Sequence, residues 1–297
     1  MTSSIVNTVK NKRAGLTSPV RLVKGAYIRR LFHVLPLTII NPVPGTLWAR
    51  LLIAASMVLL PWMPIQAGCA PKQIDLHSQV SRVIDGDTLQ LKDSTRVRLI
   101  GINTPEIKHS GTQTEHLAND AKIAVQQLLA SADYRVKLQY DRERYDRYGR
   151  TLAHVFLEDG RNIAEHLLLS GLGVHVAFPP NLWAINCYIK SETQARQHNK
   201  ALWRSNVTNA KQISRNTRGF HFVQGKVTDI GYSKKSVWIN VGPYLGVRIA
   251  RRELGQFKSI DFKKLRHKTV LVRGWITPQK NKSIIRLRHS SMIEIMK

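Results

Sequence analysis

The 297-residue sequence predicts an α+β protein, in which a small β-barrel with packed helices is followed by a second small, mostly β domain. Three short stretches between residues 80 and 102 alternate apolar and polar residues, as half-buried strands do. Later stretches place apolar residues at helical spacing and end in glycine stop signals. From residue 219 onward, strand-like segments follow one another without a convincing long helix. These observations together give the fold class.

The first domain is expected over residues 78–205. Its strands are predicted at residues 80–84, 88–91, 96–102, 134–140 and 151–157. A turn-forming "DGD" separates the first two strands. Helices are predicted at residues 112–131, 162–173 and 191–203. In the first helix the apolar residues recur at helical spacing, and in the second Gly171 and Gly173 act as stop signals.

The second domain is expected over residues 219–297, after a linker-like stretch at residues 206–218. Its strands are predicted at residues 220–230, 236–241, 246–250, 269–276, 283–288 and 292–295. Residues 251–267 form the least regular part. The pattern indicates another small β-barrel, with an OB-type barrel as one candidate.

Charge is distributed unevenly over the net +27 of the chain. Residues 1–70 carry 8 Lys or Arg and no acid, and residues 71–205 are nearly balanced with 18 basic and 15 acidic side chains. Residues 206–297 carry 20 basic side chains against 4 acids. The middle therefore resembles an ordinary domain, and the two ends are basic.

Residues 1–69 are interpreted as a basic extension with an export signal. The apolar segment at 51–65 is shorter than the roughly 20 residues of a membrane span, and it contains prolines. "QAGC" resembles a lipoprotein box, which would place a lipid on Cys69. The alternatives are cleavage near Ala67 or an uncleaved anchor. The chain is thus expected to be exported, as a periplasmic or membrane-anchored lipoprotein or a secreted protein, and to meet membrane only through this segment.

Cysteine usage is sparse, with only Cys69 and Cys187. If Cys69 is lipidated or removed, Cys187 is alone, so no disulfide framework or zinc cluster is expected. Cys187 is interpreted as a small buried apolar residue rather than as a nucleophile.

Acidic and amide side chains flank the first three predicted strands. If these strands form a meander, Asp87, the side-chain oxygen of Asn103 and a backbone carbonyl can approach one end of the barrel. Such an all-oxygen pocket suits a hard cation such as Ca²⁺. Glu106, just beyond, could orient or deprotonate a water molecule. The alternative is that "DGDT" is only a common turn.

Two arginines could bind a phosphate group beside this pocket. Arg98 lies on the third predicted strand, and Arg150 opens the fifth. Guanidinium groups bind phosphate with two donors and, together with a metal, neutralise the charge that grows during hydrolysis. The alternatives are an ordinary ion pair for Arg98 and a solvated charged loop for most of residues 141–146.

The ordered motifs "VIDGDT", "RVRLIGINTPE", "DRYGRTLA", "GLGVHVAFPPN" and "KSETQARQHNKALW" resemble the staphylococcal-type nuclease (thermonuclease) family over about residues 78–205. The resemblance implies an OB-fold barrel with three helices. It also implies Ca²⁺-dependent hydrolysis of DNA and RNA that leaves 3′-phosphates.

The resemblance also assigns roles to individual residues. Asp87 and the backbone carbonyl of Thr104 would bind Ca²⁺, and Asp85 would reach it through water. Glu106 would handle the attacking water, Arg98 and Arg150 would bind phosphate, and Tyr148 would pack near the nucleotide. Asn103 departs from the pattern, because the family has a second metal-binding aspartate there, so the site loses one negative charge.

The sequence therefore predicts an exported Ca²⁺-dependent nuclease acting on DNA, RNA or both, with no obligate protein partner. The alternative is a catalytically weak, nuclease-like protein that binds nucleic acid or serves as a scaffold or structural module of the cell envelope. The basic second domain is expected to bind nucleic acid, with Trp238 and Trp275 as surfaces on which bases stack. One competing interpretation is that both tryptophans lie in the core of the barrel. Another is that the basic face binds anionic lipid or a cell-envelope polymer.

Overall fold

The computed structural model describes residues 68–107, 114–204 and 207–296. The predicted export segment lies outside these residues. Within the described part of the chain, no helix combines the length and apolar character needed to cross a membrane.

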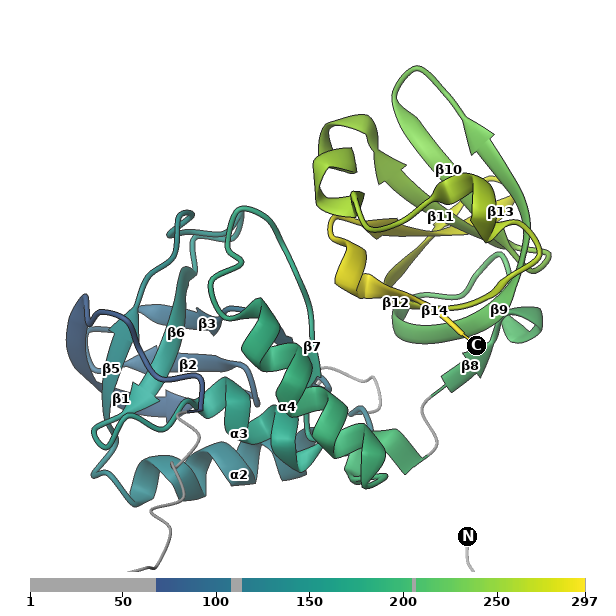
Figure 1. Cartoon of the computed structure of the whole chain (residues 1–297). Coiled ribbons are helices and arrows are strands. Elements are labelled where there is room, and N and C mark those ends of the chain that lie inside the picture. Colours follow the sequence, from purple (N-terminus) through teal and green to yellow (C-terminus); the bar gives the residue numbers. More distant parts are fainter. Residues whose placement is uncertain (1–67, 108–113, 205–206, 297) are drawn as a thin grey trace, which may run out of the picture. The chain divides into compact units, whose positions relative to one another are not determined.

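The first barrel is closed by five strands in the order β1-β2-β3-β6-β5 (Figure 1). Their bounds are β1 Leu76–Val83, β2 Thr88–Leu91, β3 Arg96–Leu99, β5 Arg135–Gln139 and β6 Thr151–Leu157. β3 and β6 run parallel, and the other neighbours are antiparallel. Alternate residues such as Leu89, Val97 and Leu138 fill the interior. The predicted barrel is therefore confirmed.

Three α-helices lie together on one side of this barrel (Figure 1). They are α2 Ala118–Ala130, α3 Ile163–Ser170 and α4 Ile185–Gln197, and the short 3₁₀ helix η1 Ala201–Arg204 follows α4. α4 begins six residues before the predicted start at 191. Its early start has no side-chain cap to signal it, since Ala184 precedes the helix. Burial of Tyr188 against the barrel holds this first turn instead.

The third predicted strand, residues 96–102, is interrupted at Gly101. Gly101 has a φ of 82°, and a Cβ there would lie 2.6 Å from the ring of Tyr188, so only glycine fits this turn. The chain then forms the two-residue strand β4 Ile102–Asn103, which pairs with β7 Val174–His175. This small sheet places Asn103 at the end of the barrel.

The second domain is also a closed barrel. Its strands are β8 Val207–Asn209, β9 Gly219–Tyr232, β10 Ser236–Val241, β11 Leu245–Ala250, β12 Thr269–Gln279, β13 Lys282–Leu287 and β14 Ile293–Ile295. Pairing of β12 with β9 closes the order β9-β10-β11-β13-β12, and β11 and β13 are parallel. Strands one to five of both barrels are thus connected in the same way, which is the OB arrangement.

Short 3₁₀ helices occupy the irregular parts of this second domain. They are η2 Ala210–Gln212, η3 Arg251–Phe257, η4 Phe262–Leu265 and η5 Ser290–Met292. The stretch at 206–218 was expected to be a linker, but β8 pairs with β9 and Ala210 is buried. That stretch is therefore partly built into the second barrel.

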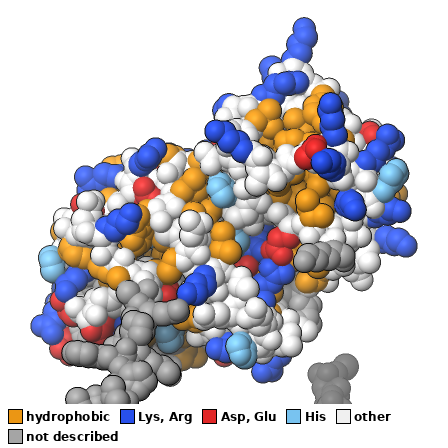
Figure 2. All heavy atoms as spheres, viewed as in Figure 1, with side chains coloured by type: hydrophobic (Ala, Val, Ile, Leu, Met, Phe, Trp, Pro, Cys, Tyr) orange, Lys and Arg blue, Asp and Glu red, His pale blue; other side chains and the backbone are white. Residues whose placement is uncertain are grey.

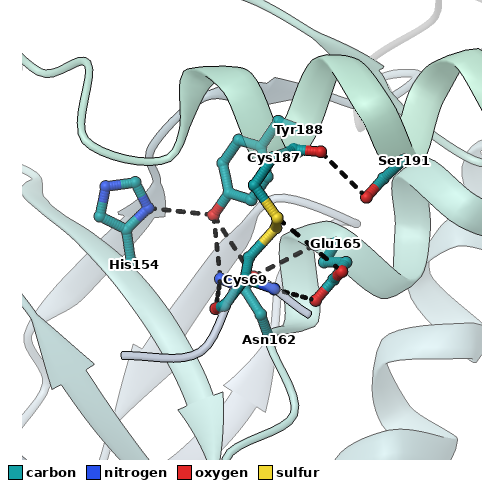
Figure 3. The surroundings of a disulfide bond; sticks show 7 residues. All are labelled: Cys69, His154, Asn162, Glu165, Cys187, Tyr188 and Ser191. Carbon is teal, nitrogen blue, oxygen red and sulfur yellow. Dashed lines mark hydrogen bonds between the residues drawn. A yellow bond between two sulfur atoms is a disulfide. The ribbon is translucent and has the colours of Figure 1, made fainter. Parts of the chain in front are cut away.

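A disulfide joins Cys69 to Cys187 across 118 residues of sequence (Figure 3). The backbone N–H of Cys69 donates to Oε2 of Glu165 in α3 at 2.8 Å, and Cys187 lies on the neighbouring α4. The expectation of no disulfide was wrong, because packing of residues 68–70 on α3 brings together cysteines that sequence spacing cannot pair. Lipidation of Cys69 stays a prediction, and it would require the sulfur of this disulfide to be free.

Candidate active site

The turn between β1 and β2 brings Asp85 and Asp87 to the end of the first barrel. Gly86 makes this approach possible, since a Cβ there would lie 2.8 Å from both Thr104 Oγ1 and the Ala121 side chain. Oδ1 of Asp85 accepts the backbone N–H of Asp87 at 3.1 Å. The turn is therefore fixed against both α2 and the segment that follows β4.

Asp87 is the centre of the predicted cluster and is 2% exposed. Its Oδ2 accepts the backbone N–H of Thr104 at 2.8 Å and lies 3.0 Å from a terminal nitrogen of Arg98. The other terminal nitrogen of Arg98 donates to the carbonyls of Leu99 and Ile102. The structure thus brings together Asp87 from the turn before β2, Arg98 of β3 and Thr104 directly after β4, at the one end of the barrel where the sequence predicted them to meet.

Asn103 supplies an unused oxygen at this site. The residue is 6% exposed, and its Oδ1 is buried without a hydrogen-bond partner among the described residues. A buried acceptor left unpaired costs about 1–3 kcal/mol, so a ligand that satisfies it is favoured. A hard cation is such a ligand, because carbonyl and carboxylate oxygens are its preferred donors.

The carboxyl groups of Asp85, Asp87 and Glu106 lie close enough to repel one another. Burial, followed by repulsion from Asp87, raises the pKa of Asp85 to about 6. Desolvation of its carboxyl, with repulsion from Asp87 and Asp85, raises the pKa of Glu106 to about 7. Glu106 as a whole residue is exposed, so water screens part of this repulsion. Together with the free amide oxygen of Asn103, these carboxylates fit a divalent cation.

Arg150 forms an ion pair with Asp146. Its Nε donates to Oδ2 of Asp146 at 2.7 Å, and Oδ1 of Asp146 accepts the backbone N–H groups of Tyr148 and Arg150. Although partial burial opposes the shift, these hydrogen bonds lower the pKa of Asp146. Asp146 was expected to belong to a solvated loop. Its position four residues before Arg150 was the available signal for this role.

Arg98 and Arg150 belong to neighbouring segments of the barrel. β3 and β6 are parallel with Arg98 opposite Leu152, and Arg150 directly precedes β6, two residues before Leu152. An open cavity of about 610 Å³ borders Arg150, and it is lined by Ser94, Thr95, Arg96, Tyr145, Tyr148, Gly149, Arg150 and Thr151. Tyr148 is 68% exposed there, with Cζ of Arg150 5.7 Å from its ring centroid. This cavity offers a cationic and aromatic surface around Arg150.

Comparison with known proteins matches residues 96–205 to the model of the family described as staphylococcal nuclease homologue. A thermonuclease of Staphylococcus intermedius is 43% identical over 105 residues, which cover 34% of this chain and 61% of that protein. The SPbeta prophage-derived endonuclease YokF of Bacillus subtilis is 32% identical over 132 residues, or 43% of this chain and 44% of its own length.

A second thermonuclease, from Staphylococcus hyicus, is 34% identical over 129 residues, which cover 42% of this chain and 74% of that protein. The chain thus spans 44% and 61% of two relatives, and about three quarters of the third. The matched family region contains Arg98, Asn103, Thr104, Glu106 and Arg150. Together with the five-stranded barrel and its three helices, these matches show that the chain belongs to the staphylococcal nuclease family.

Proposed function

We propose that this protein is an exported, Ca²⁺-dependent nuclease that hydrolyses phosphodiester bonds of DNA, RNA or both and leaves 3′-phosphates. One observation carries the proposal. The unpaired oxygen of Asn103 lies in the same buried cluster as Asp87 and Arg98, beside acids with raised pKa values. A site that gathers acids, an amide oxygen and guanidinium groups is suited to a cation and a phosphate together.

Each residue of this site has a chemical task in the proposal. Asp87, Asn103 and the Thr104 carbonyl would hold the cation, with Asp85 acting through water. The cation would supply positive charge to the phosphate oxygens. Arg98 and Arg150 would bind the same phosphate and stabilise the charge that develops in the transition state. The pKa of Glu106 near 7 suits a group that accepts a proton from water at neutral pH.

Export is part of the proposal and is supported by the Cys69–Cys187 disulfide. Structural disulfides persist in oxidising compartments such as the periplasm and the extracellular medium, and they are rare in the cytosol of mesophiles. The apolar segment at 51–65 would direct the export.

The proposed activity is tested with the purified full-length protein and single-stranded DNA or RNA, in Ca²⁺ and in EGTA. Cleavage should require Ca²⁺. The new 5′-hydroxyl ends should be phosphorylated by a polynucleotide kinase without pretreatment, and the new 3′ ends should be extended by a template-independent polymerase only after a phosphatase removes their phosphates. Equal cleavage in EGTA would reject the metal site, and 3′-hydroxyl products would reject the proposed bond scission.

Asn103 keeps a second candidate function open. An amide at the position where the family has an aspartate removes one negative charge from the site, and Ca²⁺ affinity falls with fewer charged ligands. A nuclease-like protein that binds nucleic acid with little turnover would follow. Binding of oligonucleotide without cleavage, even at millimolar Ca²⁺, would favour this candidate.

A further inference from the structure

Two tryptophans and two arginines form a row across the outside of the second barrel. Trp238 of β10 is paired with Arg248 of β11, and Arg248 is paired with Arg286 of β13. β12 and β13 pair Ile276 with Ile285, so the next step of that register places Trp275 opposite Arg286. We call these four residues, Trp238, Arg248, Arg286 and Trp275, the Trp–Arg row.

The row faces solvent, because its strand neighbours face the core. Val247, Ile249 and Ile285 are buried, and alternation along a strand therefore points Arg248 and Arg286 outward. Trp275 is 39% exposed, Arg286 is exposed, and Trp238 and Arg248 are half-buried. The core position considered for Trp238 and Trp275 is therefore not the one they occupy.

Trp238 lies against the sheet where glycine leaves room for its ring. A Cβ at Gly246 would be 3.7 Å from both Cε3 and Cζ3 of the indole, and Gly231 is the partner of Trp238 on β9. Cζ of Arg248 is 5.8 Å from the ring centroid, within cation–π range. The indole is thus a supported, partly exposed platform next to a cation.

The positive charge of the row is not cancelled by nearby acids. Within residues 207–296 the acids form ion pairs elsewhere: Asp229 with Arg266, Glu253 with Arg288, Asp261 with Lys264 and Glu294 with Arg273. Arg248 donates instead to the neutral hydroxyl of Ser236 at 2.8 Å. Figure 2 shows many Lys and Arg side chains and few acids on the visible face of this domain.

Two lysine-bearing turns flank the same face. Lys234 and Lys235 lie in the turn between β9 and β10, and Lys280 and Lys282 lie at the turn between β12 and β13. In an OB barrel, the face of strands two and three and the turns 1–2 and 4–5 are where oligonucleotides bind. β10 and β11 are strands two and three of this barrel, and the lysine-bearing turns are 1–2 and 4–5.

We propose that the Trp–Arg row binds a single-stranded polynucleotide outside the active site. Aromatic rings stack with unpaired bases, and guanidinium groups bind the intervening phosphates, so alternating rings and cations match this polymer. A duplex would offer phosphates but keep its base faces stacked. The inference deepens the proposed nuclease function and rests on it, because the row would hold the substrate strand while the first barrel cleaves.

The test measures binding of a fluorescent oligothymidylate of about 16 nucleotides, the upper site size of one such barrel. The full-length protein is used in EGTA, so that cleavage is absent. Trp238→Leu, which keeps an apolar cover on the sheet, should weaken binding by roughly 5- to 100-fold. Arg248→Ala/Arg286→Ala should also weaken it and reduce the slope of log affinity against log salt by about 1.4, at 0.7 per phosphate contact.

The matched control is Lys226→Ala/Lys268→Ala, which removes the same charge. Lys226 is five residues from Gly231 along β9, or about 16 Å, and Lys268 is seven residues from Trp275, or about 23 Å. The control should retain most of the affinity. Thermal melts of all variants by circular dichroism separate loss of binding from loss of folding, and Arg286→Ala alone, at an exposed position, provides a variant safe for folding.

Several results would overturn the proposal. If the row variants and the lysine control lost equal affinity for oligothymidylate, binding would depend on the overall positive charge of the domain and not on the row. If the protein bound duplex DNA as tightly as oligothymidylate, and Trp238→Leu changed neither affinity, base stacking on the row would be rejected. Loss of binding to anionic phospholipid vesicles, with oligonucleotide affinity unchanged, would assign the row to a lipid surface. By contrast, a wild-type protein that binds oligothymidylate through the row yet does not cleave it in Ca²⁺ would refute the nuclease function and leave the binding site proposed here standing.

Discussion

Arg273 of β12 donates from one terminal nitrogen to both carboxylate oxygens of Glu192 in α4, at 2.6 and 2.8 Å. Both residues are almost fully buried. Oε2 of Glu192 also accepts the backbone N–H of His175 at 2.7 Å, and His175 belongs to β7, the partner of the strand that carries Asn103. The second barrel is therefore joined by a buried ion pair to the strand pair at the edge of the candidate site.

Arg273→Met should destabilise the protein by about 3–5 kcal/mol, because it leaves Glu192 buried without its cation. The shift of the urea midpoint in equilibrium unfolding measures this loss. Glu192→Met/Arg273→Met should recover much of it, since an apolar pair carries no uncompensated charge. Arg135→Ala, which removes an exposed ion pair with Asp133, should change stability by less than about 0.5 kcal/mol. If Arg273→Met lowers the free energy of unfolding as little as Arg135→Ala does, the buried ion pair does not stabilise the fold as described.

The disulfide should be a major source of stability. It closes a loop of more than 100 residues, and a loop of that length gives up to about 5 kcal/mol by restricting the unfolded chain. Cys69→Ser/Cys187→Ser should therefore melt at a lower temperature than the wild type. Adding a reductant should lower the melting temperature of the wild type and leave that of the double variant unchanged. A wild-type protein with two free thiols in a thiol-labelling assay would contradict the pairing.

The raised pKa values of Asp85 and Glu106 predict a pH effect on the metal-free protein. A carboxyl whose pKa is raised on folding stabilises the fold at low pH, and this contribution is lost as pH rises through about 6 to 7. His154 and His175 have the opposite effect. Burial lowers their pKa, so their contribution to stability increases as pH rises. The measurement is therefore the difference in melting temperature between wild type and Glu106→Gln in EGTA, from pH 5 to 8.

As pH rises, the melting temperature of Glu106→Gln should increase relative to that of the wild type. Glutamine stays neutral, whereas Glu106 becomes negatively charged and is repelled by the neighbouring acids. Saturating Ca²⁺ should remove most of the pH dependence, since a ligand bound only by the folded state offsets the repulsion. A difference that stays constant across this pH range would show that Glu106 is not coupled to the acidic cluster.

Replacing Asn103 tests its role as a ligand. Asn103→Asp should lower the Ca²⁺ concentration for half-maximal binding, because it adds a charged ligand, and it should destabilise the metal-free protein by repulsion from Asp85 and Asp87. Asn103→Ala should raise that concentration. Calorimetric or fluorescence titration with Ca²⁺ gives the midpoints directly. Identical midpoints in all three proteins would remove Asn103 from the site.

Sequence alone predicted most of the local structure of the site. Strand alternation and the glycine-containing turn located Asp85 and Asp87, and the motif order placed Arg98, Glu106 and Arg150 in one family pattern. These features depend on residues close together in the chain, where periodicity and turn chemistry are informative.

Long-range contacts could not be predicted in the same way. Arg273 and Glu192 are 81 residues apart, and Cys69 and Cys187 are 118 apart. Nothing in the spacing of either pair identifies the partner, because the packing of α4 brings them together. The Trp–Arg row was likewise visible only once strand register aligned residues from β10, β11, β12 and β13.

The most direct test of the nuclease site compares Arg150→Ala with Arg142→Ala in the rate of single-turnover cleavage of a single-stranded oligonucleotide at saturating Ca²⁺. Arg142 is an exposed arginine of the same loop and serves as the control. Arg150→Ala should be slower by about 10²–10³-fold, because it removes one preorganised donor to the transition-state charge. Arg142→Ala should cleave at close to the wild-type rate. Undiminished cleavage by Arg150→Ala would contradict the site described.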